Sequence, residues 1–128
     1  MSYSAMGSVL LKPLRDDKGH IVPNRWTQEE PIHVYSYDDP ILRIPEGFET
    51  DLASVPRAFW IMTGGKTGKH QRAAVCHDYA YRQNALPKEW ADDMFYDIMR
   101  LDGVSRFRAW IMWKAVRVFG GGPYQERA

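Results

Sequence analysis

The chain contains a single cysteine, Cys76, among its 128 residues. One thiol cannot form an internal disulfide, and it cannot build a zinc site from several thiolates. A disulfide-stapled domain and a thiolate zinc cluster are therefore excluded, and the composition suits a reducing compartment.

Long apolar runs and an excess of one charge are missing as well. No segment approaches the roughly 20 apolar residues that cross a bilayer, and the first residues do not predict a signal peptide. With 17 basic and 16 acidic residues, no overall field draws the chain to nucleic acid. The hydrophobic fraction of 45% is enough for a core. We therefore expect one soluble domain over residues 1–128.

The two halves of the chain differ in pattern. Residues 1–55 predict mainly strands and turns, because short β-branched and aromatic runs are separated by Pro, Gly and Asp. Residues 32–37 alternate as a strand with two faces does, and "YDDPI" (37–41) predicts a turn set by Pro40. Residues 56–122 predict mainly helices. The expected fold is α+β, with a small N-terminal antiparallel sheet packed against about three C-terminal helices.

Three helices are predicted, at about 69–83, 87–101 and 105–119, with a shorter one over 56–62. Pro87 is a favoured first-turn residue, Gly103 supplies a left-handed stop, and Ser105 is an N-cap. Only a few residues join the first two helices, which predicts an antiparallel helical hairpin.

The stretch "AAVCHDYAYRQN" (73–84) places His77 and Asp78 inside the first helix. Residues four apart share a helix face, so His77 and Tyr81 align with Ala73, whose small side chain allows a neighbouring helix to approach. Asp78 is rotated by roughly 100° from His77 and faces elsewhere. We therefore expect His77 to point into a helix contact.

The second helix offers a carboxylate for this histidine. Asp92 lies at the inner margin of its apolar stripe, whereas Asp93 falls with Glu89 and Asp97 on a solvated face. Helical periodicity therefore predicts that Asp92, not Asp93, reaches His77. A histidine held by a carboxylate is a general base that can take a proton from water. The alternative is a buried hydrogen-bonded pair that only fixes the hairpin.

Four strings carry a family resemblance: "IPEGFETDLASVP", "RAAVCHDYAYR", "ADDMF" and "AVRVFGG". In order and spacing over residues 44–121 they resemble the phage and prophage family known as domain of unknown function 1353. The resemblance implies a small protein encoded by a bacteriophage or prophage, often near morphogenesis or tail genes. It also suggests phage structural proteins as partners, and a membrane surface is the other partner considered. The expected location is the host bacterial cytoplasm during infection, or the virion.

The stretch "HDYAY", followed by "AD" and "F", is also similar to the phospholipase A2 signature. That resemblance implies that His77 activates water, Asp78 binds calcium, Asp92 orients the histidine and Tyr81 hydrogen-bonds the inner carboxylate. The glycine-rich calcium loop of phospholipases is not reproduced upstream of His77. The first resemblance places Asp51 or Ser54 beside His77, and Asp51 is a second candidate metal ligand.

Three functional hypotheses follow. The leading one is a hydrolase in which a His77–Asp92 dyad activates water against a lipid ester, with calcium at Asp78. The second is a virion or tail-assembly protein in which the same pair is structural. The third is a cell-wall hydrolase, which needs a tighter metal site. A hydrolase requires access, so this hypothesis predicts His77 at the floor of a cleft.

Other motifs are weaker. "TGGKTGKH" (63–70) lacks the spacing of a phosphate loop. His20, His33 and His70 lack metal-ligand spacing and are expected at the surface, although His70 lies on the His77 face two turns earlier. The third helix carries four basic residues and no acid, which indicates a solvated face or contact with a membrane surface, a partner's acidic surface or nucleic acid.

Overall fold

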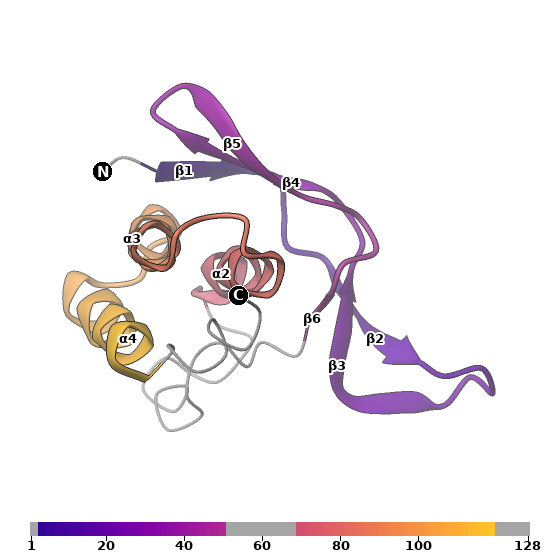
Figure 1. Ribbon diagram of the computed structural model, residues 1–128. Coiled ribbons are helices and arrows are strands. Elements are labelled where there is room, and N and C mark those ends of the chain that lie inside the picture. Colours follow the sequence, from indigo (N-terminus) through magenta and orange to yellow (C-terminus); the bar gives the residue numbers. More distant parts are fainter. Residues whose placement is uncertain (1–2, 51–68, 120–128) are drawn as a thin grey trace.

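The computed structural model describes residues 3–50 and 69–119, and the predicted helix over 56–62 lies outside them. The described elements follow the α+β order expected from the sequence (Figure 1). They are β1 (Tyr3–Met6), β2 (Leu11–Arg15), β3 (Ile21–Gln28), β4 (Ile32–Ser36), β5 (Asp39–Ile44), β6 (Glu49–Thr50), α2 (Gln71–Gln83), α3 (Lys88–Leu101) and α4 (Arg106–Phe119).

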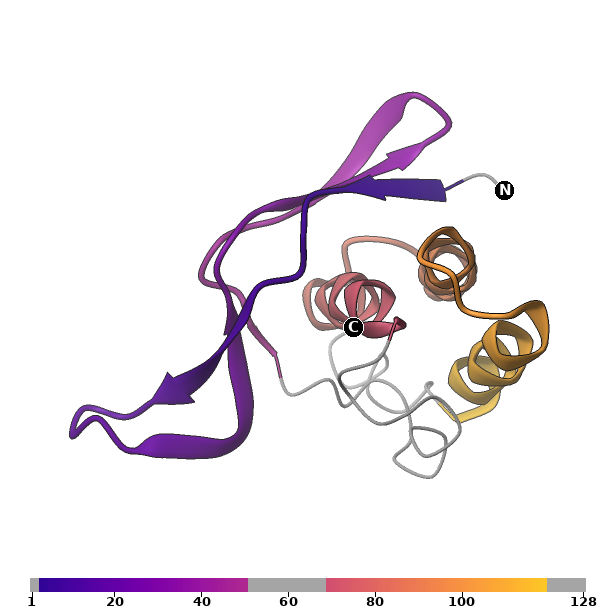
Figure 2. The ribbon, with the colours of Figure 1, turned by 180° about the vertical axis from the view of Figure 1, so that it is seen from behind.

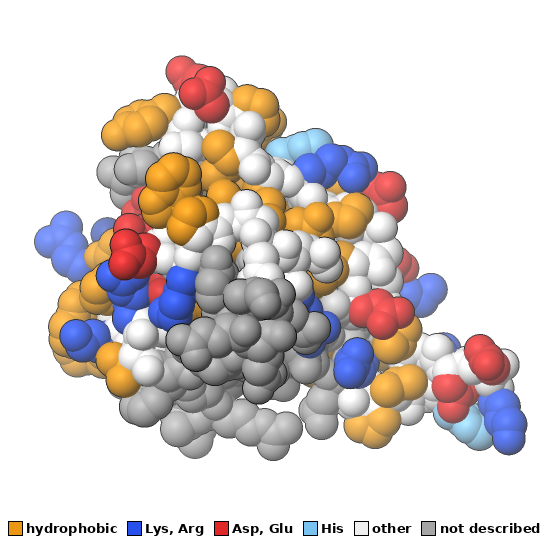
Figure 3. All heavy atoms as spheres, in the orientation of Figure 1, with side chains coloured by type: hydrophobic (Ala, Val, Ile, Leu, Met, Phe, Trp, Pro, Cys, Tyr) orange, Lys and Arg blue, Asp and Glu red, His pale blue; other side chains and the backbone are white. Residues whose placement is uncertain are grey.

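The strands divide between two antiparallel three-stranded sheets, in the orders β1-β4-β5 and β2-β3-β6. The first sheet lies over α2 and α3 and places Ile32, Val34 and Ile44 in the core. The β2–β3 hairpin extends away from the helices (Figure 2). Its tip carries exposed charges of both signs, with Asp16, Asp17 and Lys18 at residues 16–18 (Figure 3). One sheet thus covers the helices, while the β2–β3 hairpin of the other projects from them.

The turn between β4 and β5 differs from the prediction. It is formed by Tyr37 and Asp38, and Tyr37 takes a left-handed φ of 55°. Pro40 lies inside β5, opposite Tyr35, beside a register shift. Proline lacks the N–H that a central strand needs, but an edge strand with an irregular ladder tolerates it. Since β5 is the edge of its sheet, Pro40 is accommodated there and does not set the turn.

The helix ends follow the predicted signals closely. Pro87 precedes α3 as its N-cap, and Gly103, after its last turn, has a φ of 97°. The Ser105 hydroxyl accepts the N–H of Arg108 at 3.3 Å, as an N-cap does. Asn84 ends α2 in the left-handed conformation, with a φ of 48°. That short left-handed stop turns the chain back, so α3 packs along α2.

A polar contact ties the helices to the first sheet. The guanidinium of Arg72 on α2 pairs with Asp102, with Nε to Oδ2 at 3.0 Å and Nη2 to Oδ1 at 2.5 Å. Its Nη1 also donates to the carbonyl of Ala5 in β1 and to that of Gly7, just after the strand. Because a guanidinium presents its donors in a rigid fork, Arg72 fixes the distance between α2, the α3–α4 turn and β1.

Candidate functional site

The carboxylate of Asp92 is the centre of a buried polar cluster between the three described helices. Its Oδ1 is 2.8 Å from His77 Nε2 and accepts the Tyr81 hydroxyl at 2.5 Å. Its Oδ2 accepts Lys88 Nζ at 2.8 Å and lies 3.9 Å from Arg117 Nη1. We call His77, Tyr81, Lys88 and Asp92 the Asp92 cluster. The predicted contact between His77 and Asp92 is therefore confirmed, whereas the catalytic role remains a prediction.

Lys88 extends the cluster to the third helix. Its ammonium also donates to the carbonyls of Val116 and Arg117, at 3.2 and 3.3 Å. These carbonyls belong to the last turn of α4, where helical C=O groups lack an intrahelical partner and the dipole attracts a cation. Lys88 therefore neutralises Asp92 and caps α4 at the same time. The cluster thus joins α2, α3 and α4 through one carboxylate.

The imidazole of His77 is enclosed. Its exposed fraction is 0%, and its ring packs against Tyr81 and Phe95 at centroid distances of 4.0 and 4.8 Å. Ala73 and Ala74 on the same helix are fully buried, so their small side chains serve helix packing. The expectation that His77 lies at the floor of an open cleft is therefore wrong. No part of the imidazole surface is open to solvent.

Burial and the neighbouring charges set the protonation of the cluster. Burial lowers the pKa of His77, against the opposing effect of Asp92, so the imidazole is neutral at pH 7. Burial acts to raise the pKa of Asp92, but hydrogen bonds from His77, Lys88 and Tyr81 outweigh it and the pKa is lowered. An ionised carboxylate only accepts hydrogen bonds. Nε2 of His77 therefore carries the proton that bonds Asp92, and Nδ1 is the basic nitrogen.

Asp78, the candidate calcium ligand, has protein partners of its own. Its Oδ2 accepts the Thr50 hydroxyl at 2.5 Å, and its Oδ1 lies 3.3 Å from Arg82 Nε. Calcium takes six to eight oxygen ligands, and a guanidinium beside the carboxylate repels a cation. Within residues 3–50 and 69–119, no three His, Cys, Asp or Glu side chains gather where a metal ion would fit. The described donors thus do not fit calcium, and the other candidate ligand, Asp51, lies outside them.

Several residues of the site were not singled out from the sequence. The Lys88–Asp92 pair was detectable, since Lys88 precedes Asp92 by four residues and such pairs face each other on a helix. Arg82 stands in the same relation to Asp78. Thr50 and Arg117 carried no local signal, because they reach the site from β6 and from the far end of α4.

The remaining histidines differ in how far they are buried. His20 on the β2–β3 hairpin is exposed and His33 is half-buried, whereas His70, also expected at the surface, has an exposed fraction of 0%. His70 immediately precedes α2, and its carbonyl accepts the N–H of Ala74 at 2.9 Å. His70 is the N-cap residue of a largely buried helix, and the expectation that it lies at the surface is therefore wrong.

The opposite face of α3 is open. Asp93 is exposed, as periodicity predicts, and accepts the indole N–H of Trp113 on α4 at 3.1 Å. Asp97 accepts the backbone N–H of Tyr3 on β1, also at 3.1 Å. Two adjacent aspartates of one helix therefore lie in different surroundings, with Asp92 in the core and Asp93 at the surface.

The architecture is thus an α+β domain organised around a buried histidine–aspartate pair. The model of the family described as "Protein of unknown function (DUF1353)" matches residues 26–116, and the chain belongs to this family. The chain is 34% identical over 90 residues to "Uncharacterized protein y4jT" of Sinorhizobium fredii (strain NBRC 101917 / NGR234). The match covers 67% of this chain and spans only 27% of that relative. No solved structure matches the chain significantly.

One further finding concerns membranes. Among the described helices, none combines the length and the apolar character that a bilayer span requires.

Proposed function

We propose that the chain is a non-enzymatic assembly protein of a bacteriophage or prophage, in which the Asp92 cluster is a structural clamp. The phage assignment is supported by the resemblance of residues 44–121 alone. The clamp is supported by the complete burial of His77. A general base must meet water and substrate, and an imidazole without exposed surface meets neither.

The partners of the two carboxylates support the same proposal. Asp92 accepts three hydrogen bonds, from His77, Tyr81 and Lys88. Asp78 is paired with Thr50 and Arg82. Buried charges that are paired and hydrogen-bonded in this way hold helices in one arrangement. The clamp would keep α3 and α4 in the positions that an assembly partner meets.

A second candidate, the phospholipase-like hydrolase, is favoured by one observation. His77 presents Nε2 to Asp92, and Tyr81 bonds the same carboxylate, as the phospholipase A2 resemblance implies. Nδ1 would take a proton from water as the water oxygen adds to an ester carbonyl. The same nitrogen would then return the proton to the departing alkoxide. This function requires an opening to His77 that appears only when substrate binds.

Ester hydrolysis separates the two functions. The whole chain is mixed with phospholipid vesicles and with a soluble nitrophenyl ester, with and without calcium, and product is measured over time. We expect no turnover above that of the His77→Gln variant, because both lack an accessible base. Glu89→Gln, which changes an exposed acid of α3, is the matched control. Hydrolysis that His77→Gln abolishes and Glu89→Gln retains would establish the hydrolase and reject the clamp-only function.

A further inference from the structure

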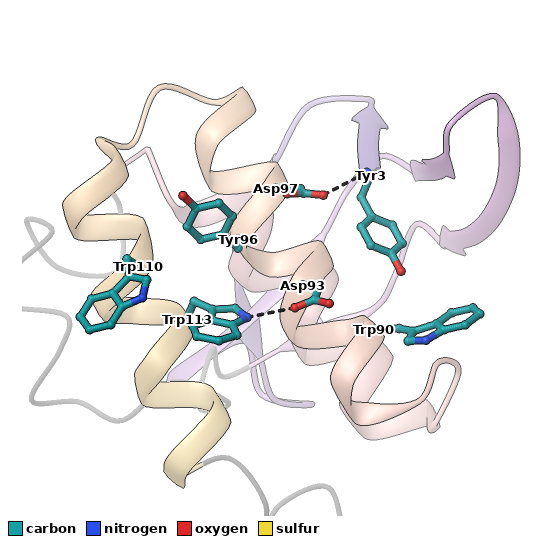
Figure 4. Close-up of a pocket in the computed structure, with 7 residues that line it drawn as sticks. All are labelled: Tyr3, Trp90, Asp93, Tyr96, Asp97, Trp110 and Trp113. Atoms are coloured by element: carbon teal, nitrogen blue, oxygen red, sulfur yellow. Dashed lines mark hydrogen bonds between the residues drawn. The ribbon is translucent and has the colours of Figure 1, made fainter. Parts of the chain in front are cut away.

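A cleft on the outer face of α3 lies apart from the Asp92 cluster. It has a volume of about 570 Å³ and is bordered by α3, α4 and β1 (Figure 4). We call it the outer cleft, and its lining residues are Tyr3, Trp90, Asp93, Tyr96, Asp97, Trp110 and Trp113. Its volume falls within the roughly 300–1,000 Å³ that small-molecule sites occupy. The cleft is therefore large enough for a ligand or a long side chain.

The lining combines aromatic rings with carboxylates. In Figure 4 the carboxylates of Asp93 and Asp97 lie between Tyr3 and Trp90 on one side and Tyr96 and Trp113 on the other. The two dashed contacts, Trp113 to Asp93 and Tyr3 to Asp97, hold both carboxylates in place. A ring presents a negative face and a carboxylate carries a full negative charge, so both attract cations.

The charged side chains that line the outer cleft are both acidic. No Lys, Arg or His belongs to its described lining. Burial raises the pKa of the Tyr3 phenol, and the charges of Asp93 and Asp97 raise it further, as expected where negative charge accumulates. The guanidinium of Arg117 lies 5.4 Å from the centre of the Trp113 ring, so one ring of the set already accommodates a cation. An anion would be repelled, and a purely apolar ligand would desolvate Asp93 without replacing its water.

We propose that the outer cleft binds an organic cation, a substituted ammonium or guanidinium group carried on an apolar stem. The stem contacts the exposed ring of Trp90, and the charged group lies between the aromatic faces beside Asp93. This inference goes beyond the clamp, because it concerns the opposite face of α3 and holds whether or not His77 is catalytic.

The test uses the full chain and measures the indole N–H signals of the tryptophans by NMR during titration. The probes are choline and its uncharged analogue of the same shape, 3,3-dimethylbutanol. We expect choline to shift the Trp90 and Trp113 signals saturably, and the alcohol to bind at least about tenfold more weakly, a difference of about 1.4 kcal/mol. Equal binding of the two probes, or no saturable shift with choline, would overturn the proposal.

Variants locate the site. Asp93→Asn and Trp90→Ala should each weaken choline binding by about tenfold, because one removes the charge and the other a ring. Glu89→Gln is the matched control, since Glu89 is an exposed acid of α3 outside the lining. Each variant is first melted to show that it folds. Equal weakening by Glu89→Gln would mean that choline responds only to net charge, and the outer cleft would not be the site.

Two further probes identify the source of the cation. N-acetyl-lysine methylamide and N-acetyl-arginine methylamide represent side chains of a partner polypeptide, whereas choline represents a free metabolite or a lipid head group. Tighter binding of either amide would assign the outer cleft to a basic protein segment, and tighter binding of choline to a small molecule. A neutral oligosaccharide that saturates the same signals better than every cation would overturn the proposal.

Discussion

The two faces of α3 show how neighbouring residues of one type acquire opposite roles. Asp92 is fully buried and accepts three hydrogen bonds, whereas the adjacent Asp93 is exposed and accepts one from an indole. A buried carboxylate must be completely satisfied, because its desolvation is otherwise too costly. An exposed carboxylate keeps its water and can bind something else. The inner face of α3 is thus suited to stability and the outer face to recognition.

The largest expected effect comes from Asp92→Ala. The change removes the carboxylate that accepts hydrogen bonds from His77 and Tyr81 and that serves as the counter-ion of Lys88. Breaking a buried pair of this kind should lower the free energy of unfolding by about 3–5 kcal/mol. Chemical denaturation followed by circular dichroism measures it. A loss below about 1 kcal/mol would show that the inner face is not the stabilising one.

The second-largest effect is expected from acid, which should lower the stability that the inner face of α3 provides. The pKa values of His77 and Asp92 are both lower in the folded chain than their ordinary values. The unfolded chain therefore binds more protons, and stability present at neutral pH is lost as the pH falls. The contribution of His77 to the free energy of unfolding begins to fall once the pH drops below 6.5, the ordinary pKa of histidine. The fall amounts to at most about 1.4 kcal/mol per pH unit.

Denaturation of His77→Gln between pH 7 and pH 5 isolates this contribution. The variant lacks the titrating group, so its stability should fall less steeply than that of the wild type. Parallel pH profiles for the two chains would contradict the neutral, buried imidazole.

Tyr81→Phe should have a smaller effect. It removes one donor to Asp92 but leaves His77 and Lys88 in place, so the cost should be about 1 kcal/mol. Tyr96→Phe on the outer face is the matched change and should cost less than about 0.5 kcal/mol. Thermal midpoints of the two variants, measured side by side, test the comparison directly. Equal shifts would remove the distinction between the two faces.

The smallest effect is expected from Asp93→Asn. The amide oxygen can still accept the Trp113 indole N–H, so stability should change by less than about 0.5 kcal/mol. The value of this variant lies in separating stability from recognition, because the same change should weaken cation binding. If Asp93→Asn unfolded the chain as Asp92→Ala does, the outer cleft would be part of the structural core.

The local sequence pattern was sufficient to predict much of the fold. Helical periodicity distinguished Asp92 from Asp93, and the cap signals at Pro87, Gly103 and Ser105 marked where helices begin and end. These features depend on residues within one or two turns of each other, whose geometry is nearly constant in any α-helix. The α+β class followed from the change in pattern between the two halves.

What only the tertiary structure decided depends on distant parts of the chain. Whether His77 is enclosed depends on how the rest of the chain packs around α2, which the spacing of residues within the helix does not reveal. Thr50 reaches Asp78 across 28 positions, and the carbonyls of α4 reach Lys88 across a similar separation. The outer cleft joins β1, α3 and α4, which no local pattern connects. The sequence by itself therefore determined which residues share a helix face, and packing determined which of those faces water can reach.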